Sequence, residues 1–165
     1  MSNQPTNSDL AIESVAARDF CIVGRVRNSA NILEVCHLLK RFNKSYYCFA
    51  ENEQSHARAG LNLHDHPDKL ASDYESLDLG GNSIRIFFEE DLAGLKNCNN
   101  LIMVLPAGKS SHIEAGIAYG LGKTCYAIGE YDITDSLYLI FDQIFPTLAH
   151  FEKFLATNSL PPTNI

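Results

Sequence analysis

Hydrophobic residues along the chain alternate between short unbroken runs and segments whose apolar positions lie three or four residues apart. Short runs that are apolar throughout predict strands buried on both faces, and the wider spacing predicts amphipathic helices. Strands are expected at 20–24, 46–50, 101–106 and 124–129. A helix capped by Asn28 or Ser29 is expected between the first two strands, with further helices at 84–98, 111–121 and 147–155. The segment 137–145 fits either a helix or a short strand.

This alternation predicts an α/β fold with an open five-stranded parallel sheet flanked by helices, like those of flavodoxin and the Rossmann proteins. The first strand, helix and second strand form a unit whose crossover is expected to be right-handed. Open parallel sheets bind ligands at the carboxyl ends of their strands, near the point where the strand order reverses. The loops that follow Val23, Leu105 and Ile128 are therefore the expected ligand-binding places.

A length of 165 residues suits one domain with a single core. We expect a polar N-terminal arm at 1–18, one α/β domain at 19–157 and a C-terminal tail at 158–165. Residues 51–83 interrupt the strand and helix pattern and are rich in His, Asp, Asn, Ser and Gly. A polar stretch of this length inside a compact domain is typical of a functional lid or of a disordered insertion, and short helical pieces within it are compatible with either.

The charge balance limits the possible partners. The chain has 13 basic and 20 acidic side chains, a formal net charge of −7, and no run of Lys or Arg. A nucleic-acid polymer is therefore not expected, and any nucleotide partner should be small. No apolar run approaches the roughly 20 residues that span a bilayer, and the polar, uncharged start lacks the features of a signal peptide. We expect a cytoplasmic protein without membrane contact.

The five cysteines are widely spread and form no CxxC pair, so they are expected to be reduced thiols in the core. His56, His64 and His66 lie in the polar stretch, where a structural or solvent-exposed role is favoured over metal binding. Neither a metal ion nor a cofactor is expected.

The loop after the strand at 101–106 carries the strongest chemical signal. Gly108, Ser110 and Ser111 place small groups and backbone N–H donors at a helix N-terminus, which favours anions and sugar hydroxyls. Glu114 is expected in the first helical turn, where the helix dipole keeps a carboxylate ionised and able to attack a sugar carbon. By spacing alone, a structural role is favoured: Ser111-His-Ile-Glu114 is a capping box, in which Glu114 bonds back to the Ser111 backbone N–H.

Three segments, in this order, resemble a known family. They are Phe20-Cys-Ile-Val-Gly-Arg-Val-Arg27, then Glu90-Asp-Leu-Ala-Gly-Leu95 with 98–105, and then Ser110-Ser-His-Ile-Glu-Ala-Gly-Ile-Ala118 with Gly122-Lys123. They are similar to motifs of the nucleoside 2-deoxyribosyltransferase superfamily, which includes the 2-deoxynucleoside 5-monophosphate N-glycosidases. The resemblance covers residues 19–155 apart from the polar stretch.

The resemblance implies a role for each matching residue. Glu114 aligns with the nucleophile that attacks C1 of the deoxyribose, and Asp91 aligns with the carboxyl group that protonates the departing base. A raised pKa is expected for Asp91, because a nearby negative carboxylate favours its protonated form. The remaining matches fall on loops that meet the sugar or the 5-phosphate: Gly24, Arg25, Val26, Arg27, Gly108 and Ser110. Family members are homo-oligomers in which a neighbouring subunit completes the site, so a homodimer or higher homo-oligomer is expected, with Ser136 as a candidate for that contribution.

The chain departs from the family pattern at two positions. Cys21 stands where many members carry Tyr, and Gly108 stands where the transferases often carry Asp. Loss of that Asp carboxylate favours an anionic substrate, for which Arg25, Arg27 and Lys109 would supply countercharge. The expected function is hydrolysis or transfer of the N-glycosidic bond of 2-deoxynucleosides or their 5-monophosphates. The alternatives are a non-catalytic nucleotide-binding sensor and an NAD glycohydrolase on the same fold.

Overall fold

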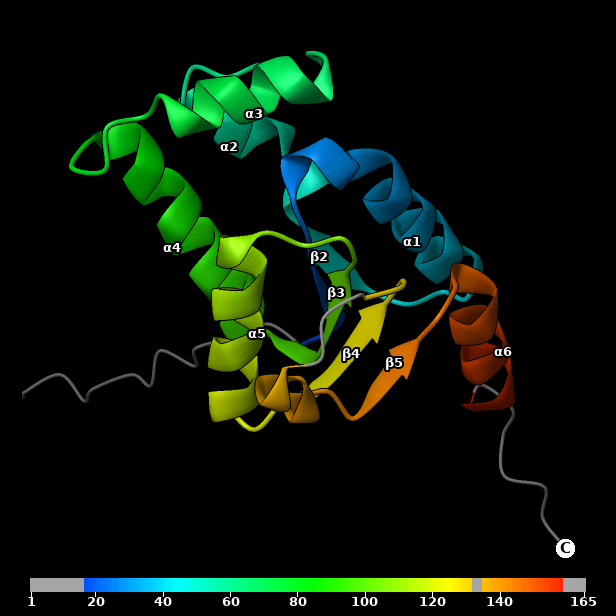
Figure 1. The fold of residues 1–165 in the computed structure, drawn as a ribbon. Coiled ribbons are helices and arrows are strands. Elements are labelled where there is room, and N and C mark those ends of the chain that lie inside the picture. The colour runs from blue at the N-terminus through cyan, green and yellow to red at the C-terminus, as the bar shows by residue number, and fades with distance from the viewer. Residues whose placement is uncertain (1–16, 132–134, 159–165) are drawn as a thin grey trace, which may run out of the picture.

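Five parallel strands form the centre of the computed structural model, which describes residues 17–131 and 135–158. Their order across the sheet is β2-β1-β3-β4-β5, so the chain starts near the middle and extends the sheet toward both edges (Figure 1). The strands are β1 (Arg18–Val23), β2 (Tyr46–Cys48), β3 (Cys98–Val104), β4 (Thr124–Ile128) and β5 (Gln143–Phe145). The predicted α/β class with an open five-stranded parallel sheet is confirmed.

Helices cover both faces of this sheet (Figure 1). Helices α1 (Ser29–Arg41) and α6 (Leu148–Asn158) pack on one face, and α4 (Asn82–Lys96) and α5 (Lys109–Gly120) pack on the other. Successive residues of β1 enter opposite cores: Phe20 and Ile22 pack toward α1, whereas Cys21 and Val23 pack toward α4 and α5. Strands covered on both sides have no polar face, which is why they appear in the sequence as unbroken apolar runs.

The ambiguous segment 137–145 contains both kinds of structure. A 3-10 helix, η3 (Ser136–Ile140), is followed after two residues by β5, which forms the far edge of the sheet. Between them, the Asp142 carboxylate accepts a hydrogen bond from the backbone N–H of Cys125 at 2.8 Å. This contact ties the connection between η3 and β5 to β4.

The polar stretch 51–83 is folded into short helices rather than an irregular loop. Its elements are the end of the 3-10 helix η2 (Phe49–Glu51), α2 (Glu53–Arg58), α3 (Pro67–Glu75) and the first residues of α4. Helix α2 packs against α4, and α3 packs against the 3-10 helix η1 (Val26–Asn28), beyond the carboxyl ends of the strands (Figure 1). We call α2 and α3, with the loop that joins them, the lid.

A small aromatic core, rather than a long apolar stripe, stabilises the lid. His56 is buried, its ring packs edge-on against Tyr74 and Phe87, and its Nε2 lies 2.7 Å from the Tyr74 hydroxyl. His64 pairs with Glu53, and His66 accepts a hydrogen bond at the start of α3. Sequence periodicity misses these helices because each is too short to show a repeated apolar face.

All five cysteines are buried free thiols. Within 17–131 and 135–158, no helix is both long enough and apolar enough to cross a membrane. Most of the expected N-terminal arm, up to residue 16, and all of the expected tail except Asn158 lie outside the described residues. The expected boundary at residue 18 falls inside β1, which begins at Arg18.

Candidate active site

The strand order reverses between β1 and β3. The chain leaves β1 toward α1 on one face and leaves β3 toward α5 on the other, so the two loops diverge and a space opens between them. A cavity of about 300 Å³ lies there. Its lining comes from both loops, from η2, and from helices α3, α4 and α5: Gly24, Arg25, Val26, Arg27, Phe49, Ala71, Tyr74, Glu75, Asp91, Gly108, Lys109, Ser110, Ser111 and Glu114.

Tight packing positions the loop after β1. A Cβ atom on Gly24 would come within 2.6 Å of Ile32 Cδ1, so a larger residue here would require the buried Ile32 side chain to move. The buried Asn28 donates a hydrogen bond from its Nδ2 to the carbonyl oxygen of Pro106 at 3.4 Å. The loops after β1 and β3 are thereby held against each other. The described residues that follow β4, Gly129 to Tyr131, do not line the cavity.

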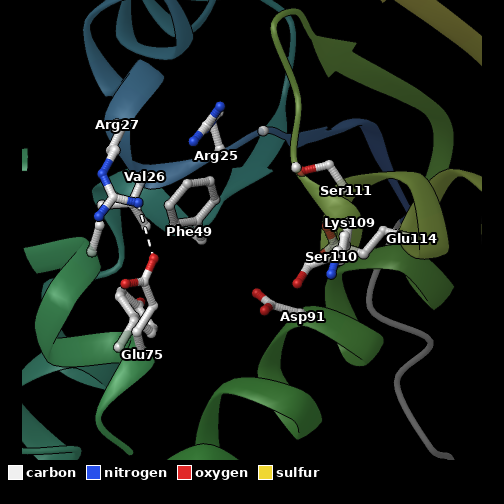
Figure 2. A pocket seen from close by; sticks show the side chains of 14 residues that line it. Arg25, Val26, Arg27, Phe49, Glu75, Asp91, Lys109, Ser110, Ser111 and Glu114 are labelled. Carbon is white, nitrogen blue, oxygen red and sulfur yellow. Dashed lines mark hydrogen bonds and ion pairs between the residues drawn. The ribbon is translucent and has the colours of Figure 1, made fainter. Parts of the chain in front are cut away.

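Helix α5 begins two residues earlier than expected, and this changes the position of Glu114. Its N-cap is Gly108, without a side-chain cap, and Glu114 is the sixth residue of the helix. The capping-box interpretation is therefore wrong, because Ser111 is already inside the helix. The carboxyl group of Glu114 forms no hydrogen bond with a residue that the structure describes, and the side chain lines the cavity (Figure 2).

The carboxyl group of Glu114 has an unusual protonation equilibrium. Removal from water, followed by the negative charge of Asp91, raises its pKa to about 8. The expectation that the helix dipole keeps Glu114 ionised is wrong for this structure, since the dipole acts mainly within the first turn and Glu114 lies beyond it. At neutral pH the unliganded site favours a protonated Glu114.

Asp91 approaches the same cavity from α4 (Figure 2). Its pKa is raised to about 6, mainly by burial and further by the charge of Glu90, while a hydrogen bond from the Tyr47 hydroxyl acts in the opposite direction. The expected direction of the shift is correct, although burial and not a neighbouring carboxylate is its largest cause. Between pH 6 and 8, Asp91 and Glu114 together hold about one proton.

The three predicted basic groups have different surroundings. Arg27 is already paired with the lid, through Nη1 to Glu75 Oε1 at 2.9 Å and Nε to Asp68 Oδ1 at 3.3 Å. Figure 2 shows Arg27 and Glu75 together on the side of the cavity opposite Glu114. Arg25 and Lys109 also line the cavity, and neither forms an ion pair with a residue in the described part of the chain. These two cations are the ones available to an anionic ligand.

Sequence analysis does not identify the cavity residues that come from η2 and the lid. Phe49 is assigned to a strand there, and Ala71, Tyr74 and Glu75 belong to the stretch without periodicity. For Ala71, Tyr74 and Glu75, the only sequence signal is the length and polarity of the segment 51–83. Ser136, in contrast, is exposed at the start of η3 and is not part of the cavity lining of its own chain.

No protein-family model matches this chain, and no curated protein matches it either.

Proposed function

We propose that this protein cleaves or transfers the N-glycosidic bond of 2-deoxynucleosides or their 5-monophosphates, with Glu114 as nucleophile and Asp91 as general acid. The observation that carries the proposal is the pair of carboxyl groups at the strand-order reversal. They come from two different helices, line one cavity, and hold about one proton between them at neutral pH. Retaining cleavage of a glycosidic bond needs one carboxylate and one carboxylic acid in this relationship.

The proposed reaction uses the two groups in turn. Glu114 forms a bond to C1 of the sugar while the bond from C1 to the base breaks, and Asp91 gives its proton to the departing base. Water or a second base then attacks C1, Asp91 takes up the proton released by that nucleophile, and the Glu114 carboxylate leaves. Attack by water gives hydrolysis, and attack by a second base gives transfer.

The proton must lie on Asp91 when the reaction starts, whereas the unliganded site favours it on Glu114. Positive charge that develops on the sugar stabilises the Glu114 carboxylate, and a basic nitrogen of the substrate's base stabilises the acid form of Asp91. The substrate itself therefore favours the required transfer of the proton from Glu114 to Asp91.

Two basic side chains that line the cavity support a 5-monophosphate over a neutral nucleoside. Arg25 and Lys109 are free of ion pairs within the described residues, and the N-terminus of α5 offers backbone N–H groups at Ser110 and Ser111. Phe49 and Tyr74 add aromatic surface suited to a flat base. A volume of about 300 Å³ is at the lower end of the usual range for ligand pockets, which favours a mononucleotide over a dinucleotide such as NAD.

A nucleotide sensor is the second candidate, and one observation favours it. A Glu114 that is mainly protonated at neutral pH is a poor nucleophile until a substrate changes its state. In a sensor, the nucleotide binds in the same cavity and the bond to its base stays intact.

The test measures base release by chromatography from deoxynucleosides, their 5-monophosphates and NAD. We expect adenine, cytosine or guanine to be released from a 5-monophosphate by the wild-type protein and not by Glu114→Gln. The control variant is Glu89→Gln, which changes an exposed glutamate on α4 that does not line the cavity. Protection against heat without release of any base would support the sensor instead, since a bound ligand stabilises whether or not it reacts.

We also propose a homodimer that uses the outer face of α5. Ile113 is 64% exposed, and a Cβ atom on Gly116 or Gly120 would meet nothing within 4 Å, so this fold itself does not require glycine there. Leu137 and Leu139 extend the apolar surface from η3, which packs against α5. Glycines on an exposed helix face permit close approach of a second copy.

Sedimentation should show a dimer that Ile113→Glu dissociates, whereas Leu79→Glu, an exposed change away from α5, should leave it intact.

A further inference from the structure

The hydroxyl of Tyr47 contacts the candidate acid. Tyr47, on β2, donates its O–H to Asp91 Oδ1 at 2.9 Å, across 44 residues of sequence. The side chain of Asn52 lowers the pKa of Tyr47 and so opposes the larger effect of burial. Tyr47 is thus a buried phenol whose hydrogen bond is given to the carboxyl group of Asp91.

The position of the Tyr47 ring depends on a glycine in α4. Gly94 follows Asp91 by three residues, so it lies on the same side of that helix. A Cβ atom at Gly94 would overlap the Tyr47 ring, which occupies the space that a larger residue would fill. Glycine weakens the interior of a helix, and here it lets the ring pass beneath α4 and reach the carboxyl group.

Asn52 begins the lid. Its Oδ1 accepts a hydrogen bond from the Ser55 backbone N–H at 3.2 Å and so caps α2, and its carbonyl oxygen lies 2.8 Å from Nδ1 of the buried His56. The residue that lowers the pKa of Tyr47 is therefore the one from which the first lid helix starts.

We propose that Tyr47 is the positioning residue for Asp91: its hydrogen bond to Oδ1 fixes the carboxyl group and leaves Oδ2 to carry the proton that is delivered to the departing base. This inference rests on the proposed function, because it assigns Tyr47 to the acid step of that reaction. Tyr47 itself touches no reacting atom.

The hydroxyl also affects the protonation of Asp91. The ionisable groups around this carboxyl are Glu90 on its own helix, Glu114 on α5, Tyr74 on α3, Cys21 on β1 and Tyr47 on β2. Among them, Tyr47 is the one that favours the charged form of Asp91, because it donates a hydrogen bond to it. Removal of the hydroxyl is therefore expected to raise the pKa of Asp91.

The test compares Tyr47→Phe with Tyr46→Phe. Both variants keep an aromatic ring on β2 and lose one hydroxyl, but the Tyr46 hydroxyl donates to Glu51, which lies outside the cavity. We expect Tyr47→Phe to lower kcat about tenfold for a base that needs protonation, with little change in KM or in kcat for a base that leaves without a proton. The acidic limb of the pH profile and the carboxyl titration of Asp91, followed by NMR, should both move to higher pH.

Gly94→Ala provides a second route, since it displaces the ring without removing the hydroxyl, and it should reproduce the effects of Tyr47→Phe. An unmoved Asp91 titration, or equal losses for both kinds of base, would overturn the inference while leaving an active wild-type protein and the proposed function intact. If the wild-type protein releases no base from any substrate, the proposed function fails first, and the catalytic role of Tyr47 fails with it.

Discussion

Asp91 on α4 and Glu114 on α5 face one cavity, and the negative charge of Asp91 adds to burial in raising the pKa of Glu114 to about 8. The two groups are therefore not independent acids. Whichever carboxyl is ionised favours the protonated form of the other, and a substrate that changes one changes both.

The pH dependence of kcat/KM is expected to be bell-shaped. The proposed reaction needs one proton on the carboxyl pair, and the pKa values of about 6 for Asp91 and about 8 for Glu114 bound the range in which that form predominates. Rates of base release measured from pH 4 to 10 should rise through a limb near 6 and fall through a limb near 8. Activity that stays level across this whole range would contradict a shared proton.

Asp91→Asn should slow the reaction according to the leaving base. An amide cannot donate a carboxylic proton, so bases that depart poorly without protonation should lose roughly 100-fold or more in kcat, and activated bases only a few-fold. Glu89→Gln, which changes an exposed carboxyl on the same helix outside the cavity lining, is the control. Equal slowing of all bases would remove the acid role from Asp91.

Glu114→Gln should make the folded protein more stable at alkaline pH. Because the folded-state pKa of Glu114 is raised from 4.5 to about 8, its contribution to stability is fully present below pH 4.5 and is lost as the pH rises through 8. The glutamine side chain does not ionise, so its contribution to stability does not change with pH. Urea unfolding at pH 5, 7 and 9 should show a difference in the free energy of unfolding that shifts in favour of the variant by about 4 kcal/mol between pH 5 and pH 9.

Glu89→Gln, which changes an exposed carboxyl on the neighbouring helix, should show no comparable trend with pH. A constant difference between Glu114→Gln and the wild-type protein at all three pH values would mean that burial does not shift the Glu114 titration.

Glu75→Gln should improve the binding of 5-monophosphates. Glu75 lines the cavity and pairs with Arg27 at 2.9 Å, so it both repels an anion and occupies a cation that could bind one. The change should lower KM for a 5-monophosphate several-fold and leave KM for the matching nucleoside unchanged. Glu53→Gln alters another exposed lid carboxylate, paired with His64 outside the cavity, and should have neither effect. A parallel change in both KM values would show that Glu75 acts on the lid and not on the charge of the substrate.

The sequence was sufficient to predict the sheet and the end of it at which the cavity lies. Residues such as Ile22 and Ile102 are buried on adjacent strands whose two faces are both covered, and such strands must be apolar throughout. Once parallel strands and intervening helices are predicted, the loops after β1 and β3 fall at the same edge of the sheet. The sequence alone thus predicts that Gly24 and Glu114, although 90 residues apart, lie at the same edge of the sheet, where both line the cavity.

Only the tertiary structure decided the protonation of Glu114 and the contacts around Asp91. A shift of three residues in the N-cap, from Ser111 to Gly108, distinguishes a capping role for Glu114 from a side chain that lines a cavity, and local spacing is compatible with both. The pKa of Glu114 depends on what excludes water from it and on a charge carried by another helix. The hydrogen bond from Tyr47 to Asp91 joins residues 44 positions apart through a space left by Gly94. Hydrophobic periodicity predicts the type of each element and the face that it buries. The burial of a particular carboxyl group and its long-range contacts exist only after the elements have packed together.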